Sequence, residues 1–538
     1  MPLLDDVDEA IDRASLYIAG HQGPHGGLVG GCAARALETG IYLHLVRAVG
    51  GDPELEPRLA AFCRAHLAAA PAGGALHDAL SALICRRVLG EWSGHECAHL
   101  EAALASFQHP TQQRKHLFFQ VLLAELGALP PPPLPPPRPR GVDPANRDQL
   151  WITVLMAALR ILVANLHGRV DRIDPADVEF IADTQGADGG WEQHVLATLV
   201  ALLALHRAGA RDDTLARGLA YVRAQVRGDG GVPFIANEDL WVTCLSGQVI
   251  AEARPSTCDL NALARFLAAR QQSNGGWAYA EGVRQTDADD TSVSLAFLGR
   301  HDPVGHREAI RRAQWYLIAL QNDDGGFPTF VRGAASEAEI TAKAIRALRT
   351  TSDASFGGRI ARAWRWLAAA QRSDGSFRAE WKLCATYPAL HVLDAAAIVG
   401  PDPLVDRVRA GALASLRQGR LPTGGWAVAG GHEVHLLSTA YAMAGLATDP
   451  EGLDRVELGR SVGLLLELQG RDGGFHGSGD SLGPRPFIYD VPILASIYSL
   501  LALSRARVAL RRHVRESAAR IEASRPRSLA AARFAASR

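Results

Sequence analysis

The heptapeptide Gln271-Gln-Ser-Asn-Gly-Gly-Trp277 recurs along this chain with one fixed spacing, Gln-xxx-Gly-Gly followed by an aromatic residue. Further copies begin at Gln185, Gln321 and Gln469, and a Gly-Ser copy begins at Gln371. Thr423–Trp426 fits the same frame with Arg420 in place of glutamine, and Gln22–Leu28 is a degenerate copy. From residue 271 onward the period is about 50 residues, which is typical of a repeat architecture.

The segments between the repeats have helical patterns. Residues 195–208 are apolar on nearly every face, which predicts a buried inner helix. Residues 337–349 divide into two faces, which predicts an amphipathic outer helix. The apolar face has Ile340, Ala344, Ile345 and Leu348, and the polar face has Glu337, Glu339, Lys343, Arg346 and Arg349. One inner and one outer helix per repeat predicts an all-α fold of helical hairpins closed into α-barrels, with glycines in the loops.

Composition excludes several classes of protein. The 538 residues are 48% hydrophobic, with a net charge of -1, which gives no electrostatic footprint for nucleic acid. Seven cysteines without a Cys-x-x-Cys motif indicate a reducing compartment. The N-terminus lacks a signal-peptide core, and apolar runs such as 195–205 are shorter than the roughly 20 residues that span a bilayer. We therefore expect a cytoplasmic monomer or homodimer without a transmembrane segment.

Two segments are compositionally biased. The proline run 130–139 favours a stiff loop inside the first half of the chain, although a linker or an SH3-type ligand has the same composition. Residues 511–538 are rich in Arg and Ala and predict a frayed helical tail, with a membrane-surface role as the alternative.

The stretch Arg284-Gln-Thr-Asp-Ala-Asp-Asp-Thr-Ser292 places three carboxylates within residues 287–290. Crowded carboxylates cannot all ionise in a low-dielectric site, so at least one pKa rises. A carboxyl group that stays protonated near neutral pH can donate a proton. The plain alternative is a helix cap or a solvated acidic turn.

Together, the repeats and the Asp-x-Asp-Asp-Thr motif resemble the class II terpene cyclases, which include squalene–hopene and copalyl-diphosphate-type cyclases. Further motifs resemble the bacterial two-domain branch that acts on linear prenyl diphosphates. They are Asp239-Leu-Trp-Val-Thr243, Glu281-Gly-Val-Arg-Gln-Thr-Asp287, Thr386-Tyr-Pro388 and Gly483-Pro-Arg-Pro-Phe-Ile-Tyr-Asp-Val-Pro492. The resemblance covers 170–505, and residues 1–170 match more loosely.

The resemblance implies two α-barrel domains, called β and γ, with the active site between them. We expect the γ domain at 21–254 and the β domain, which carries the acid motif, at 255–510. Residues 1–20 would form a helix that completes the β domain, and residues 511–538 would form the tail.

The resemblance also assigns roles. Asp289 matches the proton donor, and Asp287 and Asp290 would polarise it. Trp241, Tyr387 and Tyr489 are candidates for stabilising a carbocation through their rings, with core packing as the alternative. The repeat aromatics are expected to be structural, because they recur with the fold whereas the chemistry occurs once.

A prenyl diphosphate needs an anchor, which we expect to combine basic side chains with Mg²⁺. Arg114 and Lys115 are the candidates for the diphosphate, although a solvated charge pair has the same pattern. Asp174 and Glu179 fit an Asp-xxxx-Glu metal motif of the bacterial branch, and the alternative is helix N-terminal charges.

Two other motifs match unrelated enzymes. His95-Glu-Cys-Ala-His99 matches the zinc-protease pattern, but no clear third-ligand motif follows it. Gly479-Asp-Ser-Leu-Gly483 matches the hydrolase pattern Gly-x-Ser-x-Gly, but no strand is predicted before it.

The sequence therefore predicts an isomerase: a class II cyclase that protonates a linear prenyl diphosphate and forms a bicyclic product. Geranylgeranyl diphosphate is the first candidate substrate and farnesyl diphosphate the second. The diphosphate should remain on the product, since no Asp-Asp-x-x-Asp cluster follows the β domain. The alternatives are a squalene or prenylated-aromatic cyclase, a protein-prenyltransferase β-like subunit and an inactive repeat scaffold.

Overall fold

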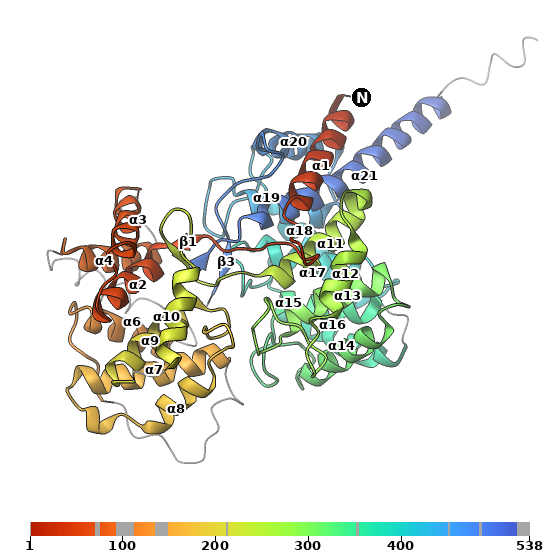
Figure 1. The fold of residues 1–538 in the computed structure, drawn as a ribbon. Helices are drawn as coiled ribbons and strands as arrows, with labels where there is room; N and C mark the ends of the chain where they lie inside the picture. The colour runs from red at the N-terminus through yellow and green to blue at the C-terminus, as the bar shows by residue number, and fades with distance from the viewer. Residues whose placement is uncertain are drawn as a thin grey trace, which may run out of the picture.

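Two helical units lie side by side in the computed structural model (Figure 1). The structure describes residues 2–69, 76–92, 112–134, 149–210, 213–350, 354–449, 452–483 and 487–524. The described part is mainly helical, with four two-residue strands, so the predicted all-α class is confirmed.

The C-terminal unit is a double ring of helices. Its inner ring consists of α11 (Asp239–Ala253), α13 (Ala288–His301), α15 (Ala338–Thr350), α17 (Thr386–Ala396), α19 (Leu436–Leu446) and α21 (Ile493–Ser524). Each inner helix packs against the next, and α21 packs against α11 to close the ring. The outer helices are α12 (Leu260–Ala268), α14 (Arg307–Leu320), α16 (Gly357–Ala370), α18 (Pro403–Gln418), α20 (Arg455–Leu468) and α1 (Pro2–Ala19).

Helix α1 lies with the C-terminal unit although it begins the chain. It packs against α20 and α21, as Figure 1 shows. The Gln469 side-chain amide donates to the Ala10 carbonyl at 3.0 Å. The C-terminal unit begins before the boundary predicted at 254/255, and its last helix continues into the predicted tail, 511–538. Helix α11 packs in the C-terminal ring, and α21 continues past residue 510.

The N-terminal unit contains the remaining α-helices of the described residues. They are α2 (Ala36–Ala48), α3 (Leu55–Ala69), α4 (Leu76–Leu89), α6 (Gln112–Glu125), α7 (Leu150–Leu166), α8 (Pro175–Asp183), α9 (Val195–Arg207) and α10 (Asp213–Ala224). Helix α9 packs between α7 and α2 and is buried along Val195–Leu205, as predicted for an inner helix. The described part of the proline run, residues 130–134, is irregular, and His167 hydrogen bonds to the Pro132 carbonyl at 2.9 Å.

Short strands connect the two units. β1 (Ala34–Arg35) pairs antiparallel with β2 (Val232–Pro233), and β3 (Ser481–Leu482) pairs antiparallel with β4 (Ile488–Tyr489). The amide of Ala33 donates to the Asp490 carbonyl at 2.9 Å, which joins the β3–β4 hairpin to the chain entering the N-terminal unit. Three 3₁₀ turns complete the described elements: η2 (Val170–Arg172), η3 (Pro255–Thr257) and η4 (Ala354–Phe356).

The repeat residues hold each loop between an outer and an inner helix. The Gln271 side-chain amide donates to the carbonyls of Gly275 and Ala309, both at 2.8 Å. Gly275 has φ 90°, a conformation that favours glycine. The Trp277 amide donates to Thr291 Oγ1 at 3.0 Å and its indole N–H to the Leu267 carbonyl at 2.8 Å. This loop thereby fixes the start of α13, where the acid motif lies.

The repeat aromatics are core residues, as their recurrence indicated. Each is no more than 1% exposed, and none lines the pocket described below: Trp191, Trp277, Phe327, Phe377, Trp426 and Phe475. A further copy of the repeat frame ends at Gly230-Gly231-Val232, where valine replaces the aromatic residue and Gly230 has φ 91°.

The predicted outer helix at 337–349 is wrong, because α15 belongs to the inner ring. It packs between α13 and α17 and is buried on almost every side. The polar residues Glu339 and Lys343 are 0% and 4% exposed. Their charges face partners inside the barrel rather than solvent, so a pattern typical of an amphipathic surface helix arises here from buried polar residues.

One described helix, Ile493–Glu516 within α21, is long and apolar enough to cross a membrane. In the structure 89% of its apolar window is buried, which identifies it as a core helix of the C-terminal ring. The six described cysteines are all free, and five of them are buried.

Candidate active site

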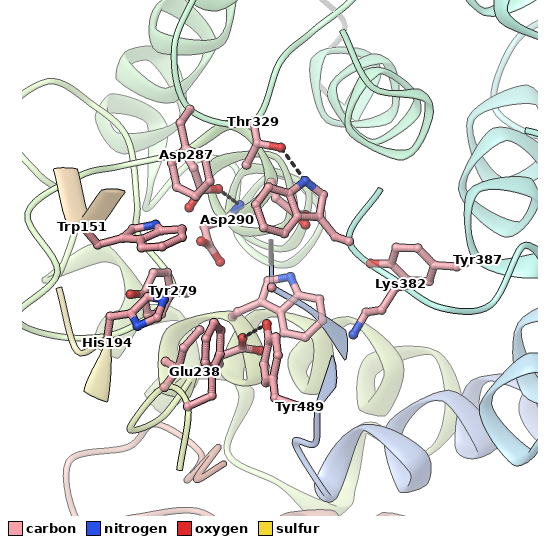
Figure 2. A pocket seen from close by; sticks show the side chains of 17 residues that line it. Trp151, His194, Glu238, Tyr279, Asp287, Asp290, Thr329, Lys382, Tyr387 and Tyr489 are labelled. Atoms are coloured by element: carbon pink, nitrogen blue, oxygen red, sulfur yellow. Dashed lines mark hydrogen bonds between the residues drawn. The ribbon is translucent and has the colours of Figure 1, made fainter. Parts of the chain in front are cut away.

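A pocket is lined by residues from both units (Figure 2). The N-terminal unit contributes Trp151 on α7 and His194, which precedes α9. The C-terminal unit contributes the acid motif and several aromatic side chains. These aromatic residues are Trp241, Tyr279, Phe330, Trp381, Tyr387 and Tyr489. A concave site with mainly apolar walls and a few polar groups is typical of a small-molecule site.

The acid motif begins the inner helix α13. Asp287 is the N-cap, and its Oδ1 accepts a hydrogen bond from the Asp290 amide at 2.7 Å. Asp287 and Asp290 are 2% and 4% exposed, whereas the Asp289 side chain is 17% exposed. All three line the pocket, but Asp289 has the most accessible carboxyl group of the three. This geometry fits the predicted division between one donor and two supporting acids.

Burial raises the pKa values of Asp287 and Asp290. Desolvation, with a smaller contribution from the charge of Asp289, raises the pKa of Asp287 to about 7. Desolvation and the charge of Asp287 raise the pKa of Asp290 well above its usual range. Because the two buried carboxyl groups would repel each other if both were ionised, the motif retains at least one proton near neutral pH.

Lys343 on α15 contacts the predicted donor. Its Nζ donates to both carboxylate oxygens of Asp289, at 2.7 and 2.9 Å, and to the Tyr387 hydroxyl oxygen at 2.6 Å. Sequence reasoning assigned Lys343 to a solvent-facing surface and missed this role. The contact between Lys343 and Asp289 could have been inferred from the sequence only if the helix with Ile340, Ala344 and Leu348 had been placed in the inner ring.

The three predicted carbocation-stabilising residues all line the pocket. Tyr387 is 1% exposed and Trp241 is 6% exposed. Lys382 Nζ lies 4.9 Å from the Trp241 ring centroid, and the Lys382 ammonium donates to Ser481 Oγ at 2.6 Å. The Tyr489 hydroxyl donates to Glu238 Oε1 at 2.7 Å. Lys382 and Glu238 also line the pocket and were not predicted.

Glu192 links the N-terminal unit to the loop before the acid motif. Its carboxylate, 4% exposed, accepts hydrogen bonds from the amides of Arg284 and Gln285 at 3.0–3.2 Å. Glu192 and Gln193 have φ of 54° and 53°, values that are uncommon for residues other than glycine. The hydrogen bonds to Glu192 hold the loop that leads to Asp287 against the N-terminal unit.

The predicted diphosphate anchors lie on α6. Lys115 is 6% exposed, Arg114 is half-buried, and neither is among the residues that line the pocket. Lys115 is four residues before Phe119, so both lie on one face of the helix. The Phe119 ring lies 5.5 Å from that of Phe487, which lies 5.6 Å from the pocket residue Phe234.

The predicted metal residues lie at the start of α8 and away from the pocket lining. Asp174 is exposed and caps α8 by accepting the Ala176 amide at 3.0 Å, and Glu179 is also exposed. In the described ranges no group of three His, Cys, Asp or Glu residues has the arrangement of a metal site. His95 and His99 lie outside the described residues.

The Gly-x-Ser-x-Gly match is not a nucleophile elbow. Ser481 lies in strand β3, and its hydroxyl accepts a hydrogen bond from Lys382. Gly483 contributes to the pocket lining. The arrangement as a whole combines three clustered carboxyl groups, two of them with raised pKa values, and an aromatic wall, which suits the protonation of an alkene.

The family model of the prenyltransferase alpha-alpha toroid domain matches residues 291–389 and 380–483. Drimenyl diphosphate synthase of Streptantibioticus cattleyicolor is 35% identical over 519 residues, covering 92% of this chain and 94% of that protein. Drimenyl diphosphate synthase of Streptomyces showdoensis is 35% identical over 510 residues, covering 92% and 93%. The structure of ent-copalyl diphosphate synthase from Streptomyces platensis matches 95% of this chain and 99% of that chain, with a TM-score of 0.59 and 18% identity, which indicates a shared fold.

Proposed function

Because this chain belongs to the class II terpene cyclases, enzymes that cyclise prenyl chains by protonating an alkene, we propose that its substrate is farnesyl diphosphate and its product a drimenyl-type bicyclic diphosphate. Two relatives with this product name are 35% identical over most of the chain. The proposal therefore reverses the order expected from the sequence, which placed geranylgeranyl diphosphate first.

The observation that carries the proposed mechanism is the position of Asp289. Its carboxyl group is the most accessible of the motif and lies in a pocket with aromatic walls. Asp289 donates its proton to the terminal alkene, whose electron pair forms the new C–H bond and leaves a tertiary cation. Two successive alkenes attack the cationic centre and form two C–C bonds. Loss of a proton from the last cation completes the isomerisation, and the diphosphate stays bonded.

Lys343 prepares the donor. In the structure its ammonium group donates to Asp289, so the two side chains hold a labile proton between them. A substrate that fills the pocket displaces water, and a dry environment favours neutral groups over an ion pair. Moving the proton from Nζ to the carboxylate then produces the neutral acid that protonates the alkene.

Aromatic rings stabilise the cations that follow. Rings can contribute about 2 kcal/mol or more to a desolvated cation. Trp241, Tyr387 and Tyr489 line the pocket with the acid, which supports the assignment of these three residues. The unpredicted Phe330 and Trp381 belong to the same wall.

The diphosphate binds toward the N-terminal unit in this proposal. Lys115 lies on the α6 face that is connected to the pocket through Phe119, Phe487 and Phe234. We assign Lys115, with Arg114 beside it, to the neutralisation of the diphosphate. Asp174 and Glu179 do not fit a resident metal site, since Asp174 caps its own helix and both are exposed. Mg²⁺, which binds readily to phosphate oxygens and water, therefore enters with the substrate.

The proposal is tested by incubating the protein with farnesyl diphosphate, geranylgeranyl diphosphate and squalene separately. Products are identified by mass spectrometry before and after phosphatase treatment. We expect a bicyclic fifteen-carbon alcohol from farnesyl diphosphate, released only by phosphatase. If geranylgeranyl diphosphate is the preferred substrate, the twenty-carbon assignment made from the sequence is correct. If only squalene is converted, the substrate is not a prenyl diphosphate. A cytoplasmic location and a monomeric or homodimeric state are part of the proposal.

A further inference from the structure

Among the described residues, Glu238 is the one carboxylate outside the acid motif that lines the pocket. This residue precedes α11 and is 6% exposed, but its side chain makes no capping hydrogen bond to the helix. Its Oε1 accepts the Tyr489 hydroxyl at 2.7 Å instead. Burial of a carboxylate is unfavourable because the charge loses its hydration, so a buried glutamate without a capping role in the helix indicates a role in the pocket.

The charges around Glu238 suit a proton acceptor. Burial raises the pKa of Glu238, and the charge of Asp289 raises it further, while Lys382, the Tyr489 hydroxyl and Lys343 lower it. The lysines therefore favour the ionised form, and burial makes that form more basic than an exposed carboxylate. Figure 2 shows Glu238 and Tyr489 on the side of the pocket opposite Asp287 and Asp290.

We propose that Glu238 is the base that ends the cyclisation and that Tyr489 is its positioning residue. The inference rests on the proposed function. A C–H bond next to the last cationic carbon breaks, its electron pair forms the product C=C bond, and the proton moves to the Glu238 carboxylate. One proton enters from Asp289 and one leaves to Glu238, so the reaction remains an isomerisation. The Tyr489 hydroxyl holds one oxygen and leaves the other for the proton.

His194 is the histidine in the pocket lining, and its environment argues against its acting as the base. Burial, with the charge of Arg35, lowers the pKa of His194 to about 3, which makes it a weak base. Its Nδ1 accepts the Ala197 amide at 3.4 Å, so the neutral ring carries its hydrogen on Nε2. The ring, stacked on Trp151 at 4.4 Å, therefore offers the pocket an N–H group rather than a lone pair.

The test compares Glu238→Gln with the wild type on farnesyl diphosphate. Glutamine keeps the shape and still accepts the Tyr489 hydroxyl but cannot take the proton. General acid–base groups contribute roughly 10²–10⁴-fold, so we expect formation of the normal alkene to fall at least roughly 100-fold. Hydroxylated products or other alkene isomers should appear, because the cation still forms. The normal product as the main product, at a rate within threefold of wild type, would overturn the proposal.

Two further variants separate chemistry from folding. Glu125→Gln is the matched control, because the Glu125 side chain is also buried, at 3% exposed, but it pairs with Arg207 in the N-terminal unit and does not line the pocket. It should keep the wild-type product pattern. Tyr489→Phe keeps the Glu238 charge without its hydrogen bond, so it should give by-products and a lower kcat with an unchanged KM. A wild-type product pattern in Tyr489→Phe would contradict the positioning role even if Glu238→Gln fails to fold. Failure of the wild type to consume farnesyl diphosphate would instead remove the proposed function.

Discussion

Replacing Asp289 by asparagine removes the proposed proton donor and keeps the shape of the side chain. The amide has no acidic proton, so cyclisation should fall by at least roughly 10³-fold, within the range that general acids contribute. The structure adds a second consequence that the sequence did not indicate. Lys343, whose side chain is 3% exposed, would lose the carboxylate that neutralises it.

The cost to stability follows from that ion pair. Lys343 Nζ lies 2.7 and 2.9 Å from the two carboxylate oxygens, and removing one partner of a buried pair costs about 3–5 kcal/mol. Asparagine keeps one oxygen as an acceptor, Tyr387 still accepts a hydrogen bond, and the Asp289 side chain is 17% exposed. We therefore expect the low end of the range, about 3 kcal/mol. In a unit of this size that corresponds to a fall in Tm of roughly 6 °C.

A double variant separates the two consequences. Asp289→Asn with Lys343→Met removes both charges, so the Tm should recover most of its loss while activity stays absent. Thermal unfolding measures the first effect, and phosphatase treatment followed by mass spectrometry measures the second. Turnover by Asp289→Asn within tenfold of wild type would remove Asp289 from the donor role. An unchanged Tm in the single variant would show that the ion pair contributes nothing to stability.

Three further predictions concern pH dependence, the repeat loop and the metal requirement. Asp287 has a folded pKa of about 7, above its ordinary value of 3.8, so stability should fall as pH rises from about 4 to 7 and activity should fall above about pH 7. Asp287→Asn preserves the helix cap and should reduce the dependence of Tm on pH, and an unchanged slope would contradict this assignment. Gln271→Ala loses two hydrogen bonds and should cost about 2 kcal/mol in chemical denaturation with the product unchanged, and a loss below about 0.5 kcal/mol would show that the loop does not need them. EDTA should abolish turnover and Mg²⁺ should restore it without zinc, whereas full activity in EDTA would favour a substrate without a diphosphate.

The repeat motif predicted the architecture because its residues act locally. The contacts of Gln271, Gly275 and Trp277 lie within one loop and its neighbouring helices. Such local contacts require a fixed spacing, which can be read directly from the sequence. The acid motif was recognisable for the same reason, since the N-cap contact between Asp287 and Asp290 spans three residues.

Helix α15 shows where a sequence pattern is insufficient. Charged residues on one face normally indicate solvent, but Glu339 accepts the amides of Glu380 and Trp381, and Lys343 pairs with Asp289. These partners lie about 40 to 54 residues away in the chain. A periodicity argument cannot distinguish a charge that faces water from one that faces a distant partner.

The remaining site residues come together through contacts between segments that are distant in the chain. Glu192 and the loop at Arg284 lie 92 residues apart, and Glu238 and Tyr489 lie 251 residues apart. No local spacing connects such pairs. The motifs around Trp241 and Tyr489 located part of the pocket wall from the sequence. Glu238 and Lys382 could be identified as pocket residues only from the three-dimensional structure.

The central claim is that the reaction begins by protonation of an alkene and leaves the diphosphate in place. Turnover of farnesyl diphosphate in D₂O tests both parts at once. The deuterium content of the product reports protonation of the alkene, and the amount of inorganic pyrophosphate reports loss of the diphosphate. The account predicts one carbon-bound deuterium per bicyclic product and no pyrophosphate before phosphatase treatment. A hydrocarbon product without deuterium, formed with stoichiometric pyrophosphate, would contradict it.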